Sequence, residues 1–541
     1  MENAGRLSVM LDCSRNAIMH LPALKRFISN IKKMGYDRLL LYMEDVYELD
    51  GEPLFGYMRG RYSKAELKEI DAYGVSVGVE IVPCIQTLAH LHQMFQWRKY
   101  HEIRDMNDVL LIGEEKTYEL IGKMFQTCAE CFSTKTIHIG MDEAFMMGLG
   151  KYREKHGFVD RNELFLGHLD RVCKQVKEYG YERIIIWSDM FFNLAFGQYS
   201  ADGELAPEVL EKVPEGLELV FYDYSSDTYE AYEKMIKAHL AFGNPVSFGA
   251  GAWKWAVLTP INQYSIPRNE VALRACRDYG VKDTMLTLWG DDGWECSAYA
   301  VLPTLMHFAE CAKGNYDMQS IKQKFLEIFG VPFDDFTLLD LRFPDTFKKK
   351  TPESNGAKAM FYSDPFIGKY DSTVCGTGEE RKQYEVFAKQ IKEAKKRSGE
   401  FAYLFDFYEK LCEYLSVKYD LGYRSRTVYQ SGDKKQLAKL LPFYKQSEKR
   451  LKKVLASFEK LWNTDNKPSG FEVHELRIGG LIIRLKSCRK RIQAYLKGKI
   501  SRIEELEVEL VDFYGGDELE KVLPTCWGAQ YASTVNRRWA F

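Results

Sequence analysis

The sequence has almost no excess of charge of either sign and no long hydrophobic run. Its 541 residues carry a formal net charge of −2, so it lacks the concentrated basic surface that nucleic-acid binding requires. No stretch reaches the roughly 18 consecutive apolar residues that indicate a membrane-spanning helix. Residues 1–11 have neither the basic nor the apolar segment of a secretory signal. We therefore expect no nucleic-acid partner and no membrane partner.

Paired metal-binding cysteine motifs are missing as well. Cysteine occurs 12 times, and the single CxxC motif, Cys128 to Cys131, has no second CxxC that would complete a zinc site. We expect no metal and no cofactor. Since no secretory signal is visible, we interpret the cysteines as free thiols of a reducing compartment, which predicts a cytoplasmic location.

Eight short apolar runs, rich in β-branched residues, recur through the first three-fifths of the chain. Because the runs are continuous rather than alternating, they indicate strands buried on both faces, as in parallel sheets. Amphipathic helical patterns separate them, and two of these patterns, residues 21–35 and 162–180, end at glycine. The order predicts an α/β fold, a (β/α)8 TIM barrel, over residues 1–314. The runs begin at Ser8, Arg38, Val75, Thr136, Arg183, Leu217, Val246 and Thr284.

Residues 315–541 have a different pattern. Long charged segments with apolar residues at helical spacing predict a mainly α-helical C-terminal domain. We interpret residues 351–378, rich in Gly, Ser, Thr and Pro, as a connecting loop. The aromatic stretch around Trp539 is a candidate contact between subunits, which leaves a homo-oligomer open. The predicted helices cover residues 379–398, 400–421, 434–462 and 473–497.

Nearly every apolar run of the predicted barrel ends in a carboxylate, an aromatic or another polar residue. The C-terminal strand ends are where barrels of this kind build their active sites. A purely structural sheet would have no reason to concentrate such residues at one end of each strand, so we expect an enzyme. The residues are Asp12, Arg15, Glu44, Asp45, Gln86, His90, Asp142, Glu143, Asp189, Asp223, Trp253, Trp289 and Asp291.

The segment IHIGMDE, residues 137–143, places two adjacent carboxylates at one strand end. Glycoside cleavage needs an acid that protonates the leaving oxygen and a group that stabilises or attacks the cationic carbon. Successive residues of a strand face opposite sides, so the chain must leave the strand here for Asp142 and Glu143 to serve one site. One carboxylate would then be the acid, and its neighbour would hold a substrate group.

The HxGxDE pattern on a barrel strand resembles the glycoside hydrolase family 20 β-N-acetylhexosaminidases, and in particular a bacterial branch with a helical tail. The resemblance implies an exo-acting enzyme that removes terminal non-reducing β-linked GlcNAc, GalNAc or both from a glycan or glycoconjugate. The family uses substrate-assisted catalysis, in which the 2-acetamido group forms an oxazoline and configuration is retained. The similarity extends to MLDCSR from Met10, VPCIQTLAH from Val82, WSD from Trp187, FYDY from Phe221 and TLWGDD from Thr287.

The resemblance also implies roles for individual residues. Asp142 would accept the acetamide N–H, and Glu143 would protonate the leaving oxygen, with a pKa raised by its charged neighbour. Tyr222 or Tyr224 would donate to the acetamide carbonyl, and Arg15 would bind ring hydroxyls. The other predicted substrate-binding residues are Gln86, His90, His138, Trp187, Asp223, Trp253, Trp289 and Asp291.

Three residues depart from the family pattern. Met141 replaces the second glycine of HxGGDE, and Gln86 and Cys84 replace carboxylates. These changes leave open a barrel glycosidase of altered sugar specificity, and a sugar-binding barrel without activity is a further alternative. The third alternative is a metal-dependent barrel hydrolase, although no histidine lies near the fifth or sixth strand end. Its ligands would come from His90, His92, His138, Asp142 and Asp291.

Overall fold

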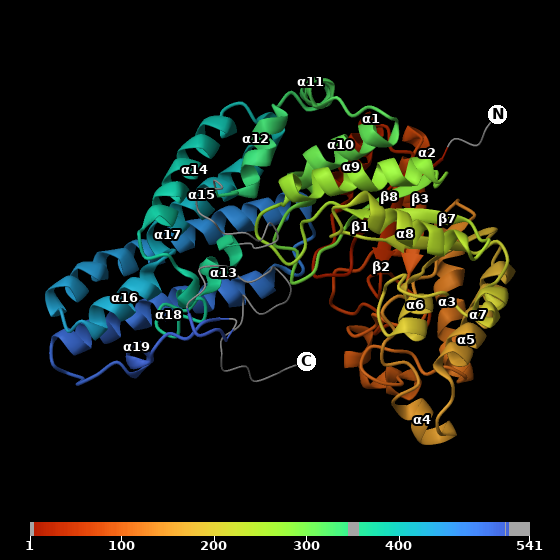
Figure 1. Ribbon diagram of the computed structural model, residues 1–541, viewed down its shortest axis with the longest axis horizontal. Helices are drawn as coiled ribbons and strands as arrows, with labels where there is room; N and C mark the ends of the chain where they lie inside the picture. Colours follow the sequence, from red (N-terminus) through yellow and green to blue (C-terminus); the bar gives the residue numbers. More distant parts are fainter. Residues whose placement is uncertain (1–4, 344–355, 514, 519–541) are drawn as a thin grey trace. The chain divides into compact units, whose positions relative to one another are not determined.

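The computed structural model describes residues 5–343, 356–513 and 515–518, and the chain divides into two compact units (Figure 1). The first unit consists of Met1–Trp253, Ser265–Trp289 and Thr304–Ile321, and the second of Lys254–Tyr264, Gly290–Pro303 and Lys322–Phe541. The domain division predicted between residues 314 and 315 stays a prediction, and the stretch around Trp539 lies outside the described residues. Within the described ranges, every helix is too short or too polar to span a membrane.

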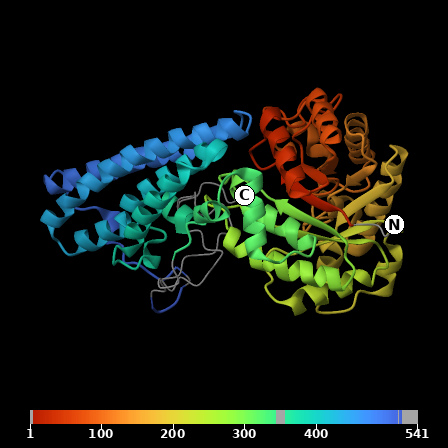
Figure 2. The same cartoon turned by 90° about the horizontal axis from the view of Figure 1, so that it is seen from above.

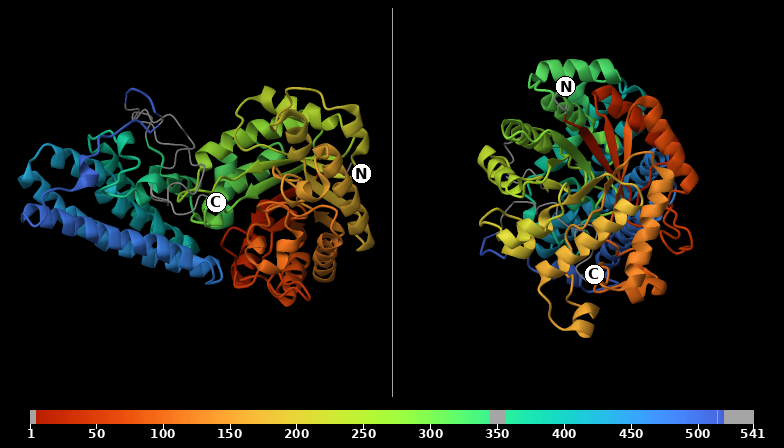
Figure 3. Two further views of the ribbon diagram at one scale, coloured as in Figure 1. Left: turned by 90° about the horizontal axis from the view of Figure 1, so that it is seen from below. Right: turned by 90° about the vertical axis from the view of Figure 1, so that its right-hand side faces the viewer.

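Eight parallel strands close into a barrel in the order of the sequence, and β8 pairs with β1. The right-hand view of Figure 3 shows the strands surrounded by helices. The predicted (β/α)8 barrel is therefore confirmed. The strands are β1 (Leu7–Asp12), β2 (Arg38–Met43), β3 (Glu80–Ile85), β4 (Thr136–His138), β5 (Arg183–Trp187), β6 (Glu218–Tyr222), β7 (Val246–Gly251) and β8 (Asp283–Leu288).

Side chains from alternate strand positions fill the inside of the barrel. Leu40 and Tyr42 of β2, and Ile185 and Trp187 of β5, belong to one buried cluster. Residues two apart on a strand point to the same face. Tyr42 and Trp187 therefore belong to the barrel core and also stand near the C-terminal ends of their strands, where the predicted site residues lie.

Helices follow the strands where the amphipathic patterns predict them. The first helix ends where Gly35 adopts a φ of +98°, a left-handed conformation that glycine accepts without strain. The helices of this part of the chain are α1 (Leu21–Met34), α2 (Lys64–Val77), α3 (Glu115–Cys131), α4 (Lys151–His156), α5 (Arg161–Glu178), α6 (Asp189–Phe196), α7 (Pro207–Lys212), α8 (Tyr229–Leu240), α9 (Asn262–Asp278), α10 (Leu302–Ala312) and α11 (Met318–Phe329).

The strand predicted from Val75 is wrong in its first residues. Helix α2 continues to Val77, Gly78 ends it with a φ of +73°, and β3 begins only at Glu80. Val75 itself is 61% exposed. The apolar run therefore spans the end of a helix and the beginning of a strand, two elements that hydrophobicity alone cannot separate.

The second unit is mainly helical, which confirms the helical C-terminal region. Its two longest helices, α17 and α18, lie side by side (Figure 2). All four helices predicted here are present, with ends shifted by a few residues. The helices are α12 (Phe333–Thr337), α13 (Gly356–Tyr362), α14 (Glu379–Lys395), α15 (Ala402–Lys418), α16 (Leu421–Gln430), α17 (Lys434–Asp465), α18 (Phe471–Leu496) and α19 (Glu504–Glu507).

The loop predicted over residues 351–378 is corrected by α13. Residues 351–355 lie outside the described residues, but the chain forms a helix from Gly356 to Tyr362. Met360 and Phe361 are buried in the second unit. The helix is only seven residues long and lies within a Gly- and Ser-rich segment, so packing rather than local propensity stabilises it.

A buried ionic cluster in the second unit is centred on Lys358 of α13. Its Nζ lies 2.5 Å from Asp292 Oδ2 and 2.6 Å from Glu295 Oε2. Arg477 of α18 pairs with the same two carboxylates, at 2.7 and 3.1 Å. Burial alone would raise the pKa of Glu295, but the charges of Lys358 and Arg477 outweigh it and lower that pKa to about 2. Two cations thus neutralise two buried anions.

We predict that Lys358→Met strongly destabilises the protein, because it leaves two buried carboxylates with one cation. The expected loss in the free energy of unfolding is roughly 3–5 kcal/mol, measured from the helical circular dichroism signal in a denaturant titration. The control Lys396→Met breaks a solvent-exposed pair with Glu393 and should leave the unfolding midpoint unchanged. Equal midpoints for both variants would contradict the prediction.

Candidate active site

The chain turns sharply where β4 ends. After the strand stops at His138, Gly140, Met141 and Glu143 have φ values of +73°, +72° and +51°. This left-handed backbone is open to glycine and strained for the other two residues. The expectation that the chain leaves the strand before the two carboxylates is confirmed. The turn frees Asp142 and Glu143 from the alternation of a strand.

The two adjacent carboxylates occupy different environments. The side chain of Asp142 is 9% exposed and that of Glu143 is 48% exposed. One oxygen of Asp142 accepts a hydrogen bond from Gln86 Nε2 at 2.7 Å, and the other lies 3.1 Å from His90 Nε2. Burial would raise the pKa of Asp142, but the charge of His90 and its hydrogen bonds lower it. Asp142 is therefore a buried anion, and its neighbour reaches solvent.

His90 carries a positive charge between the two carboxylates. Its Nε2 lies 3.1 Å from Asp142 and 3.6 Å from Glu143. Burial would lower the pKa of His90, but the charge of Asp142 outweighs it and raises that pKa to about 9. The backbone of His90 has a φ of +58°, and its N–H donates to Asp108 Oδ2 at 3.0 Å. The ring is thus held against both acids.

A chain of polar contacts connects the ends of the first four strands. Gln86 Nε2 donates to Asp142 and lies 2.9 Å from the hydroxyl of Tyr42. That hydroxyl donates to Glu44 Oε1 at 3.3 Å, and Glu44 pairs with Arg15. The structure therefore brings Arg15, Gln86 and Asp142 together through Tyr42 and Glu44.

Aromatic side chains from β5, β6 and β8 adjoin this chain of polar contacts. Trp187 meets Tyr222 edge to face, with ring centroids 5.4 Å apart, and it is tilted against Trp289, with ring centroids 6.0 Å apart. The rings of Tyr222 and Tyr224 stack, with their centroids 5.5 Å apart. The indole N–H of Trp289 donates to the Tyr224 hydroxyl at 3.0 Å. Burial raises the pKa of both tyrosines. Their hydroxyls therefore keep their protons at neutral pH and can act as donors.

His138 supports the turn from inside the barrel. It is fully buried, its Nδ1 accepts the backbone N–H of Gly140 at 3.1 Å, and its ring packs on Trp187 at 4.7 Å. Burial lowers the pKa of His138 to about 3. The imidazole is neutral, and the contact at Nδ1 places its proton on Nε2.

Three predicted residues make other contacts. Asp223 Oδ1 accepts two backbone N–H groups of the loop that follows it, so one of its oxygens stabilises a local turn. Trp253 is buried, and its backbone N–H donates to Ser265 Oγ. Asp291 belongs to the second unit. The substrate-binding roles of Asp223, Trp253 and Asp291 stay predictions.

Three further residues contact the predicted site residues, and of these Glu44 and Asp189 are among the strand-end residues named above, whereas Tyr42 is new. Tyr42 and Glu44 link Arg15 to Gln86. Asp189 Oδ2 accepts the backbone N–H of Glu143 at 3.0 Å. Glu44 and Asp189 carry a signal in the sequence, because both follow an apolar run. Tyr42 has none, since it lies inside a run and resembles any core aromatic.

Three other side chains of the barrel have the spacing of metal ligands. Glu270 of α9 and His307 and Cys311 of α10 place their ligand atoms within 4.8 Å of one another, and they form the one such group among the described residues. Arg274 donates to Glu270 at 2.8 Å, so one carboxylate oxygen already has a cationic partner. None of the predicted site residues belongs to this group.

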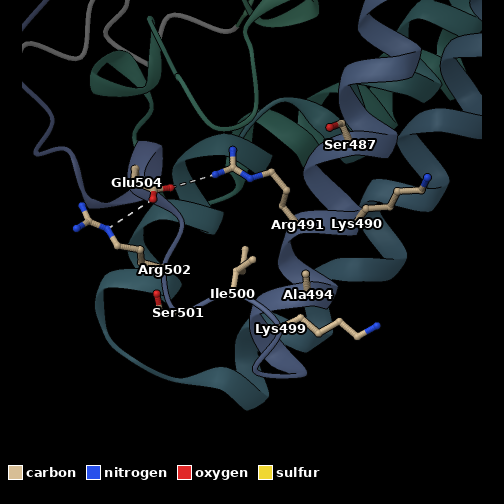
Figure 4. Close-up of a pocket in the computed structure, with 9 residues that line it drawn as sticks. All are labelled: Ser487, Lys490, Arg491, Ala494, Lys499, Ile500, Ser501, Arg502 and Glu504. Carbon is tan, nitrogen blue, oxygen red and sulfur yellow. Dashed lines mark hydrogen bonds and ion pairs between the residues drawn. The ribbon is translucent and has the colours of Figure 1, made fainter.

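The helical unit has a surface hollow of about 650 Å³ at the C-terminal end of α18 (Figure 4). Arg491 and Arg502 point toward Glu504, with ion pairs of 3.3 and 3.8 Å. Lys490 and Lys499 point away from it. Among the residues that line the hollow, Glu504 is the one acid and none is aromatic, so the lining lacks the groups that glycoside chemistry needs.

We predict that His90 makes protein stability depend on pH. Its pKa is higher in the folded protein, about 9, than the roughly 6.5 of an unfolded chain. The stabilisation is therefore complete below about pH 6.5 and is lost as pH rises through 9. The difference in Tm between the wild type and His90→Gln should shrink from pH 6 to pH 9.5. The control His92→Gln, at an exposed position, should follow the wild type. A constant difference for His90→Gln would contradict the assignment.

Two family models match the chain. "Glycosyl hydrolase family 20, catalytic domain" matches residues 9–202, and "Glycoside Hydrolase 20C C-terminal domain" matches residues 334–523. Together these matches cover more than half of the chain.

Individual relatives are distant. Hexosaminidase D of Homo sapiens is 24% identical over 325 residues, which are 56% of this chain and 64% of the relative. A probable beta-hexosaminidase of Arthroderma benhamiae is 24% identical over 156 residues, 24% of this chain and 25% of the relative. The chain thus spans just under two thirds of the human relative and a quarter of the fungal one.

Solved structures of the same family are similar at low identity. One is the GH20 exo β-N-acetylglucosaminidase of Vibrio harveyi in complex with N-acetylglucosamine, at 15% identity and a TM-score of 0.47, covering 62% of this chain and 59% of that chain. Another is the GH20 β-N-acetylhexosaminidase of Streptomyces coelicolor A3(2), at 17% identity and a TM-score of 0.46, covering 61% of this chain and 70% of that chain. On the two family matches, this chain belongs to glycoside hydrolase family 20.

Proposed function

We propose that this protein is an exo-acting β-N-acetylhexosaminidase that removes terminal non-reducing β-linked GlcNAc, GalNAc or both, with retention of configuration. The observation that carries the proposal is the pairing of a buried anion with a half-exposed acid. Asp142 and Glu143 follow one another in a left-handed turn, and the cationic His90 lies against both. Family membership supports the reaction class.

Asp142 has the properties of a group that holds the acetamide of the substrate. It is ionised and nearly buried, so its charge is weakly screened by water. It would accept the acetamide N–H and orient the carbonyl oxygen toward C1. As the oxazoline forms, positive charge develops on the acetamide, and the fixed anion of Asp142 stabilises it. Intramolecular attack also raises the effective concentration of the nucleophile.

Glu143 has the exposure that an acid and base needs. Nearly half of its side chain is open to solvent, so the leaving group and later a water molecule can reach it. It would protonate the departing glycosidic oxygen and then remove a proton from the water that opens the oxazoline. His90, 3.6 Å away, supplies a positive charge that favours the carboxylate formed in the first step.

The aromatic residues supply the remaining contacts. The rings of Trp187 and Trp289 would enclose the acetamide methyl group and stack on the sugar. The hydroxyls of Tyr222 and Tyr224 retain their protons, and one of them would donate to the acetamide carbonyl. Arg15, paired with Glu44, would bind ring hydroxyls. This arrangement would enclose one terminal sugar and so favour exo-action.

We also propose that the protein works in a reducing compartment such as the cytoplasm. Eleven cysteines of the described residues are free thiols, and ten of them are buried. An oxidising compartment would select for paired cysteines. The proposal is tested by fractionating cells and locating the protein with an antibody, and recovery in a secreted or periplasmic fraction would contradict it.

The activity is tested with nitrophenyl β-glycosides of GlcNAc, GalNAc, glucose and galactose, in the presence of EDTA. We expect hydrolysis of the two acetamido sugars alone, and inhibition by a thiazoline that mimics the oxazoline. Equal rates on the plain glycosides would contradict substrate assistance and favour a glycosidase of altered specificity. Loss of activity in EDTA would favour a metal-dependent hydrolase.

The two acids should fail in different ways. Glu143→Gln should lower kcat by about 10²–10⁴-fold on a poor leaving group and far less on 3,4-dinitrophenyl β-GlcNAc, which needs no protonation. Asp142→Asn should lower kcat for both substrates alike, since it weakens the formation of the oxazoline itself. Steady-state kinetics on the two substrates checks both expectations. A uniform loss for Glu143→Gln would remove it from the acid role.

Gln86→Glu should show why an amide stands at this position. Gln86 Nε2 donates to Asp142 at 2.7 Å. A carboxylate here would replace that donor with a second negative charge beside Asp142. We expect the added carboxylate to raise the pKa of Asp142. The acid limb of the kcat/KM profile should then shift to higher pH. Gln86→Met, a neutral variant of similar size, should lower activity without moving that limb. An unshifted limb in Gln86→Glu would contradict the electrostatic account.

A further inference from the structure

A buried carboxyl group beside the two acids has no part in the reaction proposed above. Asp189 follows β5 and begins α6, and its side chain is fully buried. Its Oδ2 accepts the backbone N–H of Glu143 at 3.0 Å and the amide of Asn193 at 3.2 Å. Its Oδ1 has no hydrogen-bond partner among the described residues. Asp189 therefore holds the backbone of the acid.

The residue it contacts is in a strained conformation. Glu143 has a φ of +51°, and a left-handed backbone costs a residue with a side chain roughly 1–2 kcal/mol. Such a conformation persists only where surrounding contacts hold it. Asp189, at the first position of a helix, gives the N–H of Glu143 a rigid and fully buried acceptor.

We propose that Asp189 is a positioning residue that aims the Glu143 carboxyl at the leaving oxygen by holding the Glu143 backbone N–H. The proposal rests on the proposed function, because it presumes that Glu143 is the acid. Position matters here because a group displaced by about 1 Å loses much of its catalytic advantage. The same contact fixes the turn to α6, whose helical frame is more rigid than a loop.

The charges around Asp189 favour a neutral form of its carboxyl. Burial first, and then the charges of Asp142 and Glu143, raise the pKa of Asp189, while the charge of His90 lowers it. A protonated Asp189 retains a carbonyl oxygen for the N–H of Glu143 and adds no third negative charge. Asparagine has the same shape and the same acceptor, so it is the conservative variant for this position.

The test compares Asp189→Asn, Asp189→Ala and the control Asn193→Ala on β-GlcNAc substrates with good and poor leaving groups. Asp189→Ala should lower kcat by about 10²-fold on a phenyl glycoside, with KM changed less than about threefold. It should lose far less on 3,4-dinitrophenyl β-GlcNAc, where the acid is not needed. Asp189→Asn should recover activity to within about fivefold of the wild type. Asn193→Ala removes the other donor to Oδ2 of Asp189 and should retain the kcat of the wild type.

The outcomes separate this inference from the proposed function. If the wild type cleaves β-GlcNAc but Asp189→Ala loses activity equally on both leaving groups, the positioning role is wrong and the proposed function stands. If Asp189→Asn is as impaired as Asp189→Ala, acceptance of the N–H is not the role. If Asp189→Ala fails to fold, judged by circular dichroism, the leaving-group comparison on Asp189→Asn and Asp189→Ser decides. A wild type inactive on acetamido sugars would overturn the proposed function first.

Discussion

The geometry of the site depends on one backbone constraint, the left-handed turn at the end of β4. Two consecutive residues of a strand cannot face one site, because their side chains alternate. Gly140, Met141 and Glu143 remove that limit by adopting positive φ values. The strain falls on two residues with side chains, and neighbouring contacts offset it. Gln86 accepts the N–H of Met141, and Asp189 accepts that of Glu143.

The charges around the turn form a balanced set. Asp142 is a buried anion, and burial of an isolated charge is costly. His90 supplies the opposite charge at 3.1 Å, and Gln86 supplies a neutral donor at 2.7 Å. A carboxylate in place of Gln86 would face Asp142 directly, so the departure from the family pattern has a physical meaning. The protein places amide and imidazolium groups where they lower the pKa of one acid and leave the other open to solvent.

The second unit also neutralises buried charges, at a place to which we assign no catalytic role. Lys358 lies fully buried with Asp292 and Glu295, and Arg477 completes the group. Asp292 and Glu295 come from the segment after β8, whereas the two cations come from helices far along the chain. A helical pattern predicts the helices that carry these side chains, but it contains no information on which charges will meet.

The sequence by itself determined the barrel, the helical region and the strand ends at which the site lies. Apolar runs with helical patterns between them admit few folds, and the carboxyl ends of parallel strands share one edge. The HxGxDE pattern was specific enough to indicate the family and to single out Asp142 and Glu143 as the proposed acid pair. Local pattern failed where one run served two elements, as at Val75, and where packing stabilised a short helix, as in α13. Only the tertiary structure decided the partners: the ion pair of His90 with Asp142, the link through Tyr42, and the contact of Asp189 with the Glu143 backbone. These contacts join residues from different strands, and their distances follow from the closure of the barrel, which no local stretch of sequence encodes.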